Sequence, residues 1–384
     1  MKKRIVILGV TGSIGVSAQK VARALPDAMQ IVGISAHGNS DGLAAAAREF
    51  GVSAACLTNP SASPGWCSDL PPGCRAVEGT DGLIDLVTAS DADMVLIAIV
   101  GTAGLKPALA AIRAGKDIAV ASKEILVMAG EIVMAEAKKF GVRVLPVDSE
   151  HNAIFQCLEG RPTHSVQRLI LTCSGGPCRH TPTAQLADVQ PAQALRHPTW
   201  NMGQKISIDS ATLFNKGLEM IEARWLFDLP MDRIDVIVHP QSIVHSLVEF
   251  VDGSLLAQLS CSDMAFPIQY AVTWPERVEG SLKRLDLAAI RALEFEAPRV
   301  DDFPALRLAR EAGTRGGTLP AVLNAANESA VAAFLAGDIR FPQIWLLVER
   351  AMLNHATQDH PALDDLFAAD AWARDFVAGA VYGT

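Results

Sequence analysis

Short apolar runs in the first 147 residues alternate with stretches whose apolar residues recur at helical spacing. Runs of this kind predict buried strands, and the stretches between them predict connecting helices. The predicted strands are 4–8, 30–36, 94–100, 117–121 and 142–147, and the predicted helices lie near 41–50, 104–114 and 130–140. Strands that alternate with helices in this way predict a parallel, doubly wound sheet.

The pattern changes after residue 150. Strands near 166–172 and 234–239, with a hairpin over 245–259 that turns at Asp252-Gly253, predict a mixed or antiparallel sheet. Residues 276–305 carry many charges, which predicts a connection. The chain beyond them is rich in alanine and predicts helices near 304–313, 319–336 and 342–354, with Gly337 as a helix C-cap. The expected fold class is α/β, with a central α+β domain and a C-terminal helical domain. The expected boundaries are 1–147, 148–285, a connection over 286–305, and 306–384. Segment 59–75, rich in Pro, Ser and Gly, is expected to be a surface loop.

Composition excludes several classes of protein. The chain has 384 residues, of which 50% are hydrophobic, which is enough for a sizeable core. The formal net charge of −9 argues against general binding of nucleic acid or anionic membranes. No apolar run approaches the ~20 residues of a membrane span. The seven cysteines include no CxxC pair and are odd in number, which favours free thiols in a reducing cytoplasm.

A glycine-rich segment follows the first predicted strand. Gly9, Gly12 and Gly15 are spaced GxxGxxG and precede a helix-compatible stretch from Val16 to Leu25. Glycines allow the backbone to approach a pyrophosphate, and a helix N-terminus supplies free N–H groups. The segment therefore predicts a Rossmann-type dinucleotide site. The second strand ends in His37-Gly38-Asn39-Ser40 without the acidic residue that an NAD site usually carries, which favours NADP.

Two segments carry acidic residues in a pattern typical of a metal site. Asp148 and Glu150 follow the apolar run 144–147, and on a strand both would point to the same side. Glu219 lies on a polar stripe of a predicted helix with Asn215, Lys216 and Glu222. Three carboxylates that converge require a cation, and Mg²⁺ or Mn²⁺ suits hard oxygen ligands. Two solvated polar faces are the alternative interpretation.

Further polar residues indicate an anion site. Ser174 follows a predicted strand in a serine-glycine turn, and residues 207–210 are expected to cap the helix that carries Lys216. Ser174, Ser210, Asn215 and Lys216 together are suited to a phosphate, with Lys216 matching its charge.

The chain resembles 1-deoxy-D-xylulose 5-phosphate reductoisomerases from about residue 4 to its C-terminus. The segments that carry the resemblance include GVTGSIG, ASKE, LPVDSEHNAIFQ, LTCSGGP, RHPTWNMG, KISIDSATLFNKGLE and HPQSIVHS. That family makes 2-C-methyl-D-erythritol 4-phosphate for isoprenoid synthesis with NADPH and one divalent metal. The resemblance implies this activity, Mn²⁺ or Mg²⁺ (with Co²⁺ as a third option), a phosphosugar substrate and a homodimer.

The resemblance also implies roles for individual residues. Asp148, Glu150 and Glu219 match the metal ligands and, with Lys123, the catalytic residues. The residues that match substrate contacts are Lys123, Ser149, Glu150, Ser174, His197, Trp200, Ser210, Asn215, Lys216 and Glu219. Those that match cofactor contacts are Thr11, Gly12, Ser13, Ile14, Asn39, Ser122, Glu124 and Gly203. Trp200 falls in a mobile lid of about 174–204, and Met202 and Met264 fall near cofactor and substrate.

Two positions depart from the family pattern. Gly38 stands where many members have a basic residue for the 2′-phosphate, and Ser122 stands where many have Asn. Relaxed discrimination between NADPH and NADH is therefore expected. The carbon shift is open between a concerted ketol migration and cleavage with aldol recombination. Two other functions remain as alternatives: a metal-dependent NADP oxidoreductase that does not rearrange carbon, and a dinucleotide-sensing regulator that binds cofactor without turnover.

Overall fold

The computed structural model describes residues 2–89, 91–200 and 202–383. Its chain divides into two compact units. The first unit comprises residues 1–125, 131–152 and 263–283, and the second comprises 126–130, 153–262 and 284–384. Helices α5 (Lys123–Phe140) and α6 (Ser149–Leu158) contribute residues to both units.

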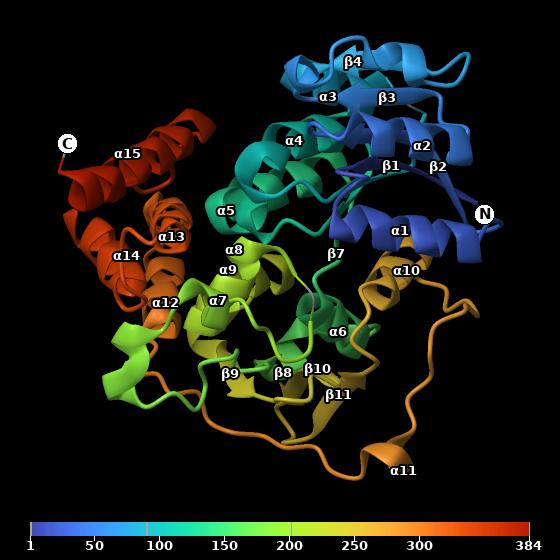
Figure 1. Cartoon of the computed structure of the whole chain (residues 1–384). Coiled ribbons are helices and arrows are strands. Elements are labelled where there is room, and N and C mark those ends of the chain that lie inside the picture. Colours follow the sequence, from blue (N-terminus) through green and yellow to red (C-terminus); the bar gives the residue numbers. More distant parts are fainter. Residues whose placement is uncertain (1, 90, 201, 384) are drawn as a thin grey trace. The chain divides into compact units, whose positions relative to one another are not determined.

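The first unit contains a seven-stranded parallel sheet in the order β4-β3-β2-β1-β5-β6-β7 (Figure 1). Its strands are β1 (Lys3–Leu8), β2 (Met29–Ala36), β3 (Ala54–Leu57), β4 (Arg75–Glu78), β5 (Met94–Ile97), β6 (Asp117–Val120) and β7 (Val144–Pro146). The central strand β1 is buried completely from Ile5 to Leu8, as expected for a parallel sheet covered on both faces. The prediction of a parallel doubly wound sheet is confirmed.

Helices connect these strands. They are α1 (Ser13–Ala24), α2 (Ser40–Phe50), α3 (Gly79–Ala89), α4 (Leu105–Arg113) and α5, and α10 (Ala265–Thr273) packs beside α1 in the same unit. Helix α1 buries small residues such as Ala18 and Ala22, which allows it to pack closely against its neighbours β2 and α10.

Part of this unit was not predicted. Strands β3 and β4 and helix α3 lie where no element was expected, and β4 begins at Arg75, the last residue of the expected loop 59–75. Within that segment the chain forms two short 3₁₀ turns, η1 (Pro60–Ala62) and η2 (Trp66–Asp69). The missed strands have four residues each, and β4 is mostly exposed, so neither carries a clear hydrophobic period. Helix α5 starts at Lys123 rather than near 130, with non-helical backbone angles at Ala129 that interrupt its period.

The second unit contains a four-stranded mixed sheet in the order β11-β10-β8-β9. Strand β10 (Val244–Phe250) pairs antiparallel with β8 (Val166–Cys173) and β11 (Leu255–Leu259), whereas β9 (Ile234–Val238) lies parallel to β8. Residue Asp252 lies in the connecting turn of the hairpin, where its carboxylate accepts a hydrogen bond from the backbone of Ser254 at 2.9 Å. The predicted mixed sheet and hairpin are confirmed.

Helices make up the rest of the second unit. They are α7 (Pro191–Ala194), α8 (Gln204–Thr212), α9 (Phe214–Phe227), α11 (Leu287–Ile290), α12 (Ala305–Arg315), α13 (Leu319–Ala336), α14 (Gln343–Asn354) and α15 (Leu363–Tyr382). Short 3₁₀ turns lie at Thr163–Ser165, Thr183–Asp188 and Met231–Arg233. Gly337 caps α13 with φ of 85°, as predicted.

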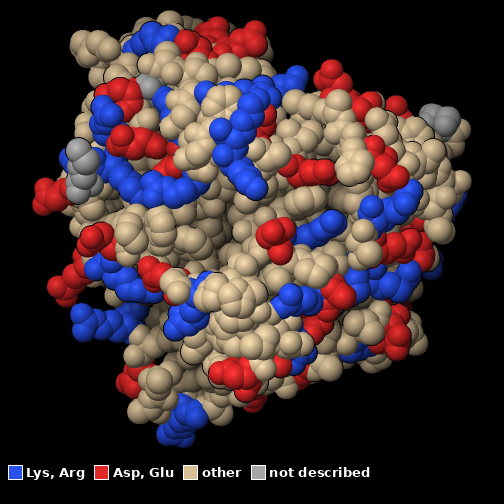
Figure 2. All heavy atoms as spheres, turned by 180° about the vertical axis from the view of Figure 1, so that it is seen from behind, with Lys and Arg blue, Asp and Glu red and all other residues tan. Residues whose placement is uncertain are grey.

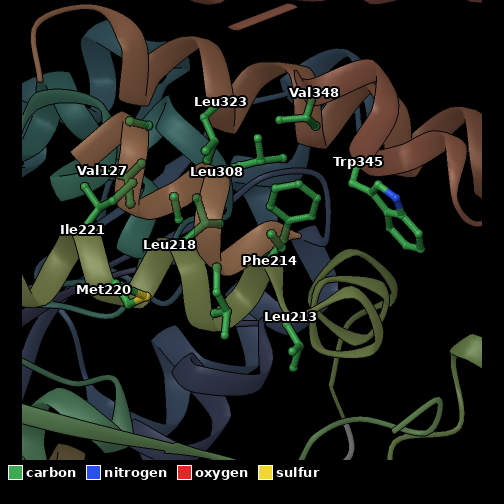
Figure 3. Packing of buried hydrophobic residues seen from close by; sticks show 14 of the residues in the cluster. Val127, Leu213, Phe214, Leu218, Met220, Ile221, Leu308, Leu323, Trp345 and Val348 are labelled. Atoms are coloured by element: carbon green, nitrogen blue, oxygen red, sulfur yellow. The ribbon is translucent and has the colours of Figure 1, made fainter. Parts of the chain in front are cut away.

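Among the described residues, a hydrophobic core joins these helices, with the exception of α11, to the sheet. Leu218 and Ile221 of α9 lie in it with Leu308 of α12, Leu323 of α13 and Val348 of α14 (Figure 3). Helix α13 is long and apolar enough to span a membrane by length and composition alone, but 72% of the relevant window is buried within the protein. We therefore interpret α13 as a core helix.

On the face shown in Figure 2, basic and acidic side chains are interspersed.

Candidate functional site

The glycine loop closes tightly between β1 and α1. Gly9 has φ of 93°, and a Cβ atom at Gly15 would lie 2.3 Å from the Gly9 carbonyl oxygen. The hydroxyl of Ser35, at the end of β2, accepts a hydrogen bond from the Gly9 N–H at 3.1 Å. Ser35 is buried and was missed by sequence reasoning, since a lone serine inside an apolar strand carries no signal of its own.

The loop leads into a helix N-terminus that is suited to an anion. Helix α1 begins at Ser13, with Gly12 as an N-cap that offers no side-chain hydrogen bond and with no acidic residue in the first turn. Thr11 and Ile14 are half-buried, whereas Gly12 and Ser13 are exposed. The positive end of the helix dipole and the backbone N–H groups at Ser13 and Ile14 would favour a phosphate here.

Two further cofactor candidates lie at strand ends of the same sheet. Asn39 caps α2, and its side-chain oxygen accepts a hydrogen bond from the Gly42 N–H at 2.9 Å. Ser122 follows β6 and is buried, and its hydroxyl donates to the carbonyl of Ile99 after β5. The Ser122 side chain therefore contacts the backbone of the neighbouring strand end. Glu124 lies half-buried in the first turn of α5.

The acidic residues of the first unit lie at a helix start and not on a strand. Strand β7 ends at Pro146, and Glu150 lies in the first turn of α6, so the expectation that Asp148 and Glu150 share one side of a strand is wrong. Lys123 Nζ lies 2.5 Å from Asp148 Oδ2, and both side chains are largely buried. The Ser149 hydroxyl donates to Glu150 Oε2 at 2.5 Å. The structure thus brings four predicted site residues of this unit together at the carboxyl ends of β6 and β7, where ligands bind in open α/β sheets.

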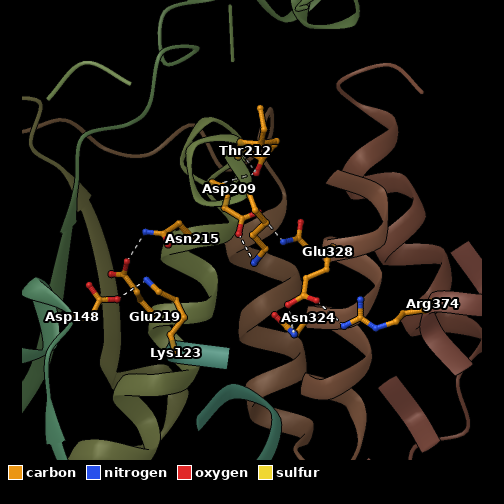
Figure 4. Close-up of polar contacts among 12 residues, drawn as sticks. Lys123, Asp148, Asp209, Thr212, Asn215, Glu219, Asn324, Glu328 and Arg374 are labelled. Atoms are coloured by element: carbon orange, nitrogen blue, oxygen red, sulfur yellow. Dashed lines mark hydrogen bonds and ion pairs between the residues drawn. The ribbon is translucent and has the colours of Figure 1, made fainter. Parts of the chain in front are cut away.

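The acidic residue of the second unit is buried with its partners on α9. Glu219 is fully buried (Figure 4). Its carboxylate accepts a hydrogen bond from Asn215 Nδ2 at 2.6 Å and forms an ion pair with Lys216 Nζ. Lys216 is only 1% exposed and Glu222 is 0% exposed. The alternative of a solvated polar face is thereby excluded for α9, because charged groups leave water only when paired or bound.

A second polar group of this unit surrounds the serine-glycine turn after β8. Ser174 is buried, and its hydroxyl lies 2.9 Å from His197 Nε2. The other ring nitrogen of His197, Nδ1, accepts a hydrogen bond from the Trp200 N–H at 2.9 Å. The Trp200 ring in turn lies edge-on to His245 of β10, with ring centroids 6.3 Å apart. His245 is a contact that sequence reasoning missed, because its place opposite Trp200 depends on strand pairing.

Ser210 lies beside the same turn. A Cβ atom at Gly176 would lie 2.6 Å from the Ser210 carbonyl oxygen, so the turn and the end of α8 are in direct contact. The expectation that residues 207–210 cap the helix of Lys216 is wrong: they lie inside α8, and Leu213, with φ of 65°, separates α8 from α9. Gly203 is the N-cap of α8.

The positions of the remaining candidate residues say less about their roles. Met202 is half-buried, and Met264 is the residue before α10. Asn201, part of the RHPTWNMG segment, lies outside the described residues. Burial raises the pKa of the Cys178 thiol to about 11, which makes it a poor nucleophile and supports a packing role.

Comparison with known proteins shows the family. Residues 5–130 match the family model described as 1-deoxy-D-xylulose 5-phosphate reductoisomerase, residues 144–227 match the model of its C-terminal domain, and residues 259–376 match a further model described as DXP reductoisomerase C-terminal domain. The reductoisomerase of Prosthecochloris aestuarii is 50% identical over 378 residues, which cover 98% of this chain and 99% of the relative.

Solved structures agree over the full length. The Zymomonas mobilis reductoisomerase in complex with NADPH superposes with a TM-score of 0.93 at 43% identity and covers 100% of both chains. A reductoisomerase in complex with NADPH, fosmidomycin and magnesium gives a TM-score of 0.93 at 40% identity, over 99% of this chain and 98% of that one. The chain therefore belongs to the 1-deoxy-D-xylulose 5-phosphate reductoisomerase family of enzymes.

Proposed function

We propose that this enzyme rearranges 1-deoxy-D-xylulose 5-phosphate and reduces the product with NADPH, giving 2-C-methyl-D-erythritol 4-phosphate. The observation that carries the proposal is the buried group on α9, where Glu219 is enclosed with Lys216 and Asn215. Burying a carboxylate and an ammonium group costs several kcal/mol per ion. Such a cost is expected where buried charges serve to bind a ligand. The buried group on α9, together with the serine-glycine turn after β8 that is suited to a phosphate, supports an enzyme that binds a sugar phosphate through a metal ion.

The proposed metal ligands are Asp148, Glu150 and Glu219. The donor set fits a hard cation, since every proposed ligand atom is a carboxylate oxygen, and a reductoisomerase relative carries magnesium. A bound Mg²⁺ or Mn²⁺ supplies Lewis-acid polarisation of the substrate's carbonyl and neighbouring hydroxyl. Asp148 pairs with Lys123 and Glu219 pairs with Lys216, so each of these two carboxylates already lies beside a positive charge.

The proposed cofactor residues belong to the first unit, with Gly203 added from the second. Thr11 to Ile14 would bind the pyrophosphate through the start of α1. Asn39 caps α2, Ser122 follows β6, and Glu124 lies in the first turn of α5. NADPH, present in solved relatives, supplies the hydride. Gly38 offers no side chain to the 2′-phosphate, so we propose that discrimination against NADH is weak.

The proposed phosphate site belongs to the second unit. Ser174 and Ser210 come together through Gly176, and Asn215 and Lys216 begin the next helix. His197 links Ser174 to the backbone of Trp200. These contacts would fix the phosphate end of the substrate, while Trp200 and the segment 174–204 cover it and exclude water. Lys123 would stabilise negative charge that develops on a substrate oxygen. We further propose that the enzyme is a homodimer and that it works in the cytoplasm. Its cysteines are free thiols, which suits a reducing compartment.

A direct assay tests the function. Purified protein is mixed with 1-deoxy-D-xylulose 5-phosphate and NADPH, with Mn²⁺ and again with EDTA, and the product is identified by NMR. We expect metal-dependent NADPH oxidation and a branched methylerythritol phosphate. Asp148→Asn should lower turnover by at least about a hundredfold, while Glu159→Gln, an exposed carboxylate just after α6, should not. A straight-chain product would indicate reduction without rearrangement, and NADPH binding without turnover by folded protein would refute the proposal.

A further inference from the structure

Asp209 is a buried carboxylate of the second unit to which the proposed function gives no role. Asp209 of α8 is 1% exposed, and its two oxygens have different partners. Oδ1 accepts a hydrogen bond from Asn327 Nδ2 at 2.8 Å, and Oδ2 lies 2.6 Å from Lys205 Nζ, one turn earlier on α8 (Figure 4). A buried charge of this kind is retained only when its partners fix it in place.

The partner Asn327 lies on the core helix α13 and is fully buried. The next residue of α13, Glu328, accepts a hydrogen bond at 2.6 Å from Arg374 of α15, which also donates to Asp370 of its own helix at 2.7 Å. The contact between Asp209 and Asn327 thus connects α8 to a firmly held part of the helical core.

Asp209 immediately precedes Ser210, a proposed phosphate ligand. The Ser210 backbone contacts Gly176 in the turn that carries Ser174, and α8 ends two residues later, before Leu213 and the helix of Lys216. A shift of α8 relative to α13 would therefore move the Ser210 hydroxyl and disturb its contact with the turn. Displacements of about 1 Å at a binding group can lower kcat/KM by up to about a hundredfold.

We propose that Asp209 and Asn327 form a positioning pair, which holds α8 against α13 so that Ser210 is placed for the substrate phosphate. The inference rests on the proposed function in assigning the phosphate to Ser210. It makes the C-terminal helices part of the substrate site, although none of their residues is expected to touch the substrate.

The first test replaces the donor. Asn327→Leu keeps the approximate volume and removes the hydrogen bond to Asp209. Because a phosphate contact is uniform binding, KM for 1-deoxy-D-xylulose 5-phosphate should rise about tenfold or more with kcat nearly unchanged. KM for NADPH should not change. Hydrogen exchange of the α8 amides should become faster, which is a readout that does not depend on the reaction.

A reversed pair provides the rescue. Asn327→Asp places two carboxylates face to face and should raise KM at least as much as Asn327→Leu. The double variant Asp209→Asn/Asn327→Asp restores one donor and one acceptor with their positions exchanged. It should recover most of the lost affinity, a coupling that two independent structural sites would not show.

A control on the same helix separates positioning from general stability. Arg374→Met removes the ion pair between α15 and α13 but leaves the contact of α13 with α8. It should lower the melting temperature without raising KM. An equal rise of KM in Arg374→Met, or an unchanged KM and α8 exchange in Asn327→Leu, would overturn the proposal. If wild-type protein showed no turnover, the proposed function would fail, while faster α8 exchange in Asn327→Leu would still support the pair.

Discussion

At the scale of residues, the most informative feature is how completely the charges of α9 are buried. The Lys216 side chain is 1% exposed and the Glu219 side chain is 0% exposed, and the two form an ion pair. Removing one member of a buried pair usually costs about 3–5 kcal/mol, because the other charge is left without compensation. In this enzyme a bound cation would provide an alternative partner for Glu219.

Lys216→Met tests that relation. We expect the variant to unfold several degrees lower than wild type in EDTA, and the difference to become smaller in Mn²⁺, which would replace the lost positive charge beside Glu219. KM for the sugar phosphate should also rise, because Lys216 is a proposed phosphate ligand. Thermal unfolding with and without Mn²⁺ measures the first effect. An equal loss of stability in both conditions would mean that Glu219 does not bind the metal.

The sequence predicted the candidate metal ligands and the polar stripe of α9, but it did not predict what surrounds them in the fold. DSEHN and NKGLE identified Asp148, Glu150 and Glu219 as candidates. Helical spacing placed Lys216, Glu219 and Glu222 on one polar stripe, yet spacing carries no information on what covers a stripe. In the structure α12 packs on α9, and the stripe is buried. Likewise, the partners His245 and Asn327 come from distant segments that only the tertiary fold brings near.

At the scale of elements, the turn after β8 determines how the proposed phosphate ligands meet. Its residues Gly175 and Gly176 have φ of 79° and 67°, in the left-handed region that favours glycine. The sequence predicted the turn from its serine and glycines, but it assigned residues 207–210 to a helix cap. The short loop at Leu213 carries no glycine or proline to mark the end of α8, and so the boundary between α8 and α9 could not be located.

Gly176→Ala tests the contact of this turn with α8. The added Cβ would lie 2.6 Å from the Ser210 oxygen, and so KM for the sugar phosphate should rise severalfold and the melting temperature should fall. Gly160→Ala is the matched control, since Gly160 has a similar φ of 70° and no atom within 4 Å of an added Cβ. A control with the same rise of KM as Gly176→Ala would show that backbone strain alone is responsible.

The C-terminal helices contain a group that responds to pH. The His355 ring, after α14, contacts Thr318 Oγ1 at 2.7 Å and lies 4.8 Å from the Trp372 ring, and burial lowers the pKa of this histidine below its usual 6.5. Since the unfolded chain binds the proton more readily, stability should be complete above pH 6.5 and decline as pH falls through the lower folded value.

His355→Gln should therefore flatten the decline of stability between pH 7 and the acid range, by at most about 1.4 kcal/mol per pH unit for one proton. Urea unfolding at a series of pH values measures the slope in wild type and variant. Parallel curves would show that other groups cause the decline.

At the scale of the whole molecule, the residues proposed for the reaction are distributed over two compact units. The glycine loop, Lys123, Asp148 and Glu150 belong to the first unit, and Glu219 and the proposed phosphate ligands belong to the second. The alternation of strands and helices predicted the parallel sheet, and the hairpin signal predicted the mixed sheet. Short strands such as β3 and β4 were not predicted, because four residues are too few to show a reliable hydrophobic period.

We propose that Asp148, Glu150 and Glu219 bind one divalent cation together. Titration of the protein with Mn²⁺, followed by the loss of the free-ion signal in electron paramagnetic resonance, tests it without any turnover. We predict one tight site per chain in wild type, with affinity lowered at least about tenfold in both Asp148→Asn and Glu219→Gln while NADPH binding is kept. Wild-type Mn²⁺ affinity in either folded variant would contradict the proposal, because the substituted carboxylate would then not be a metal ligand.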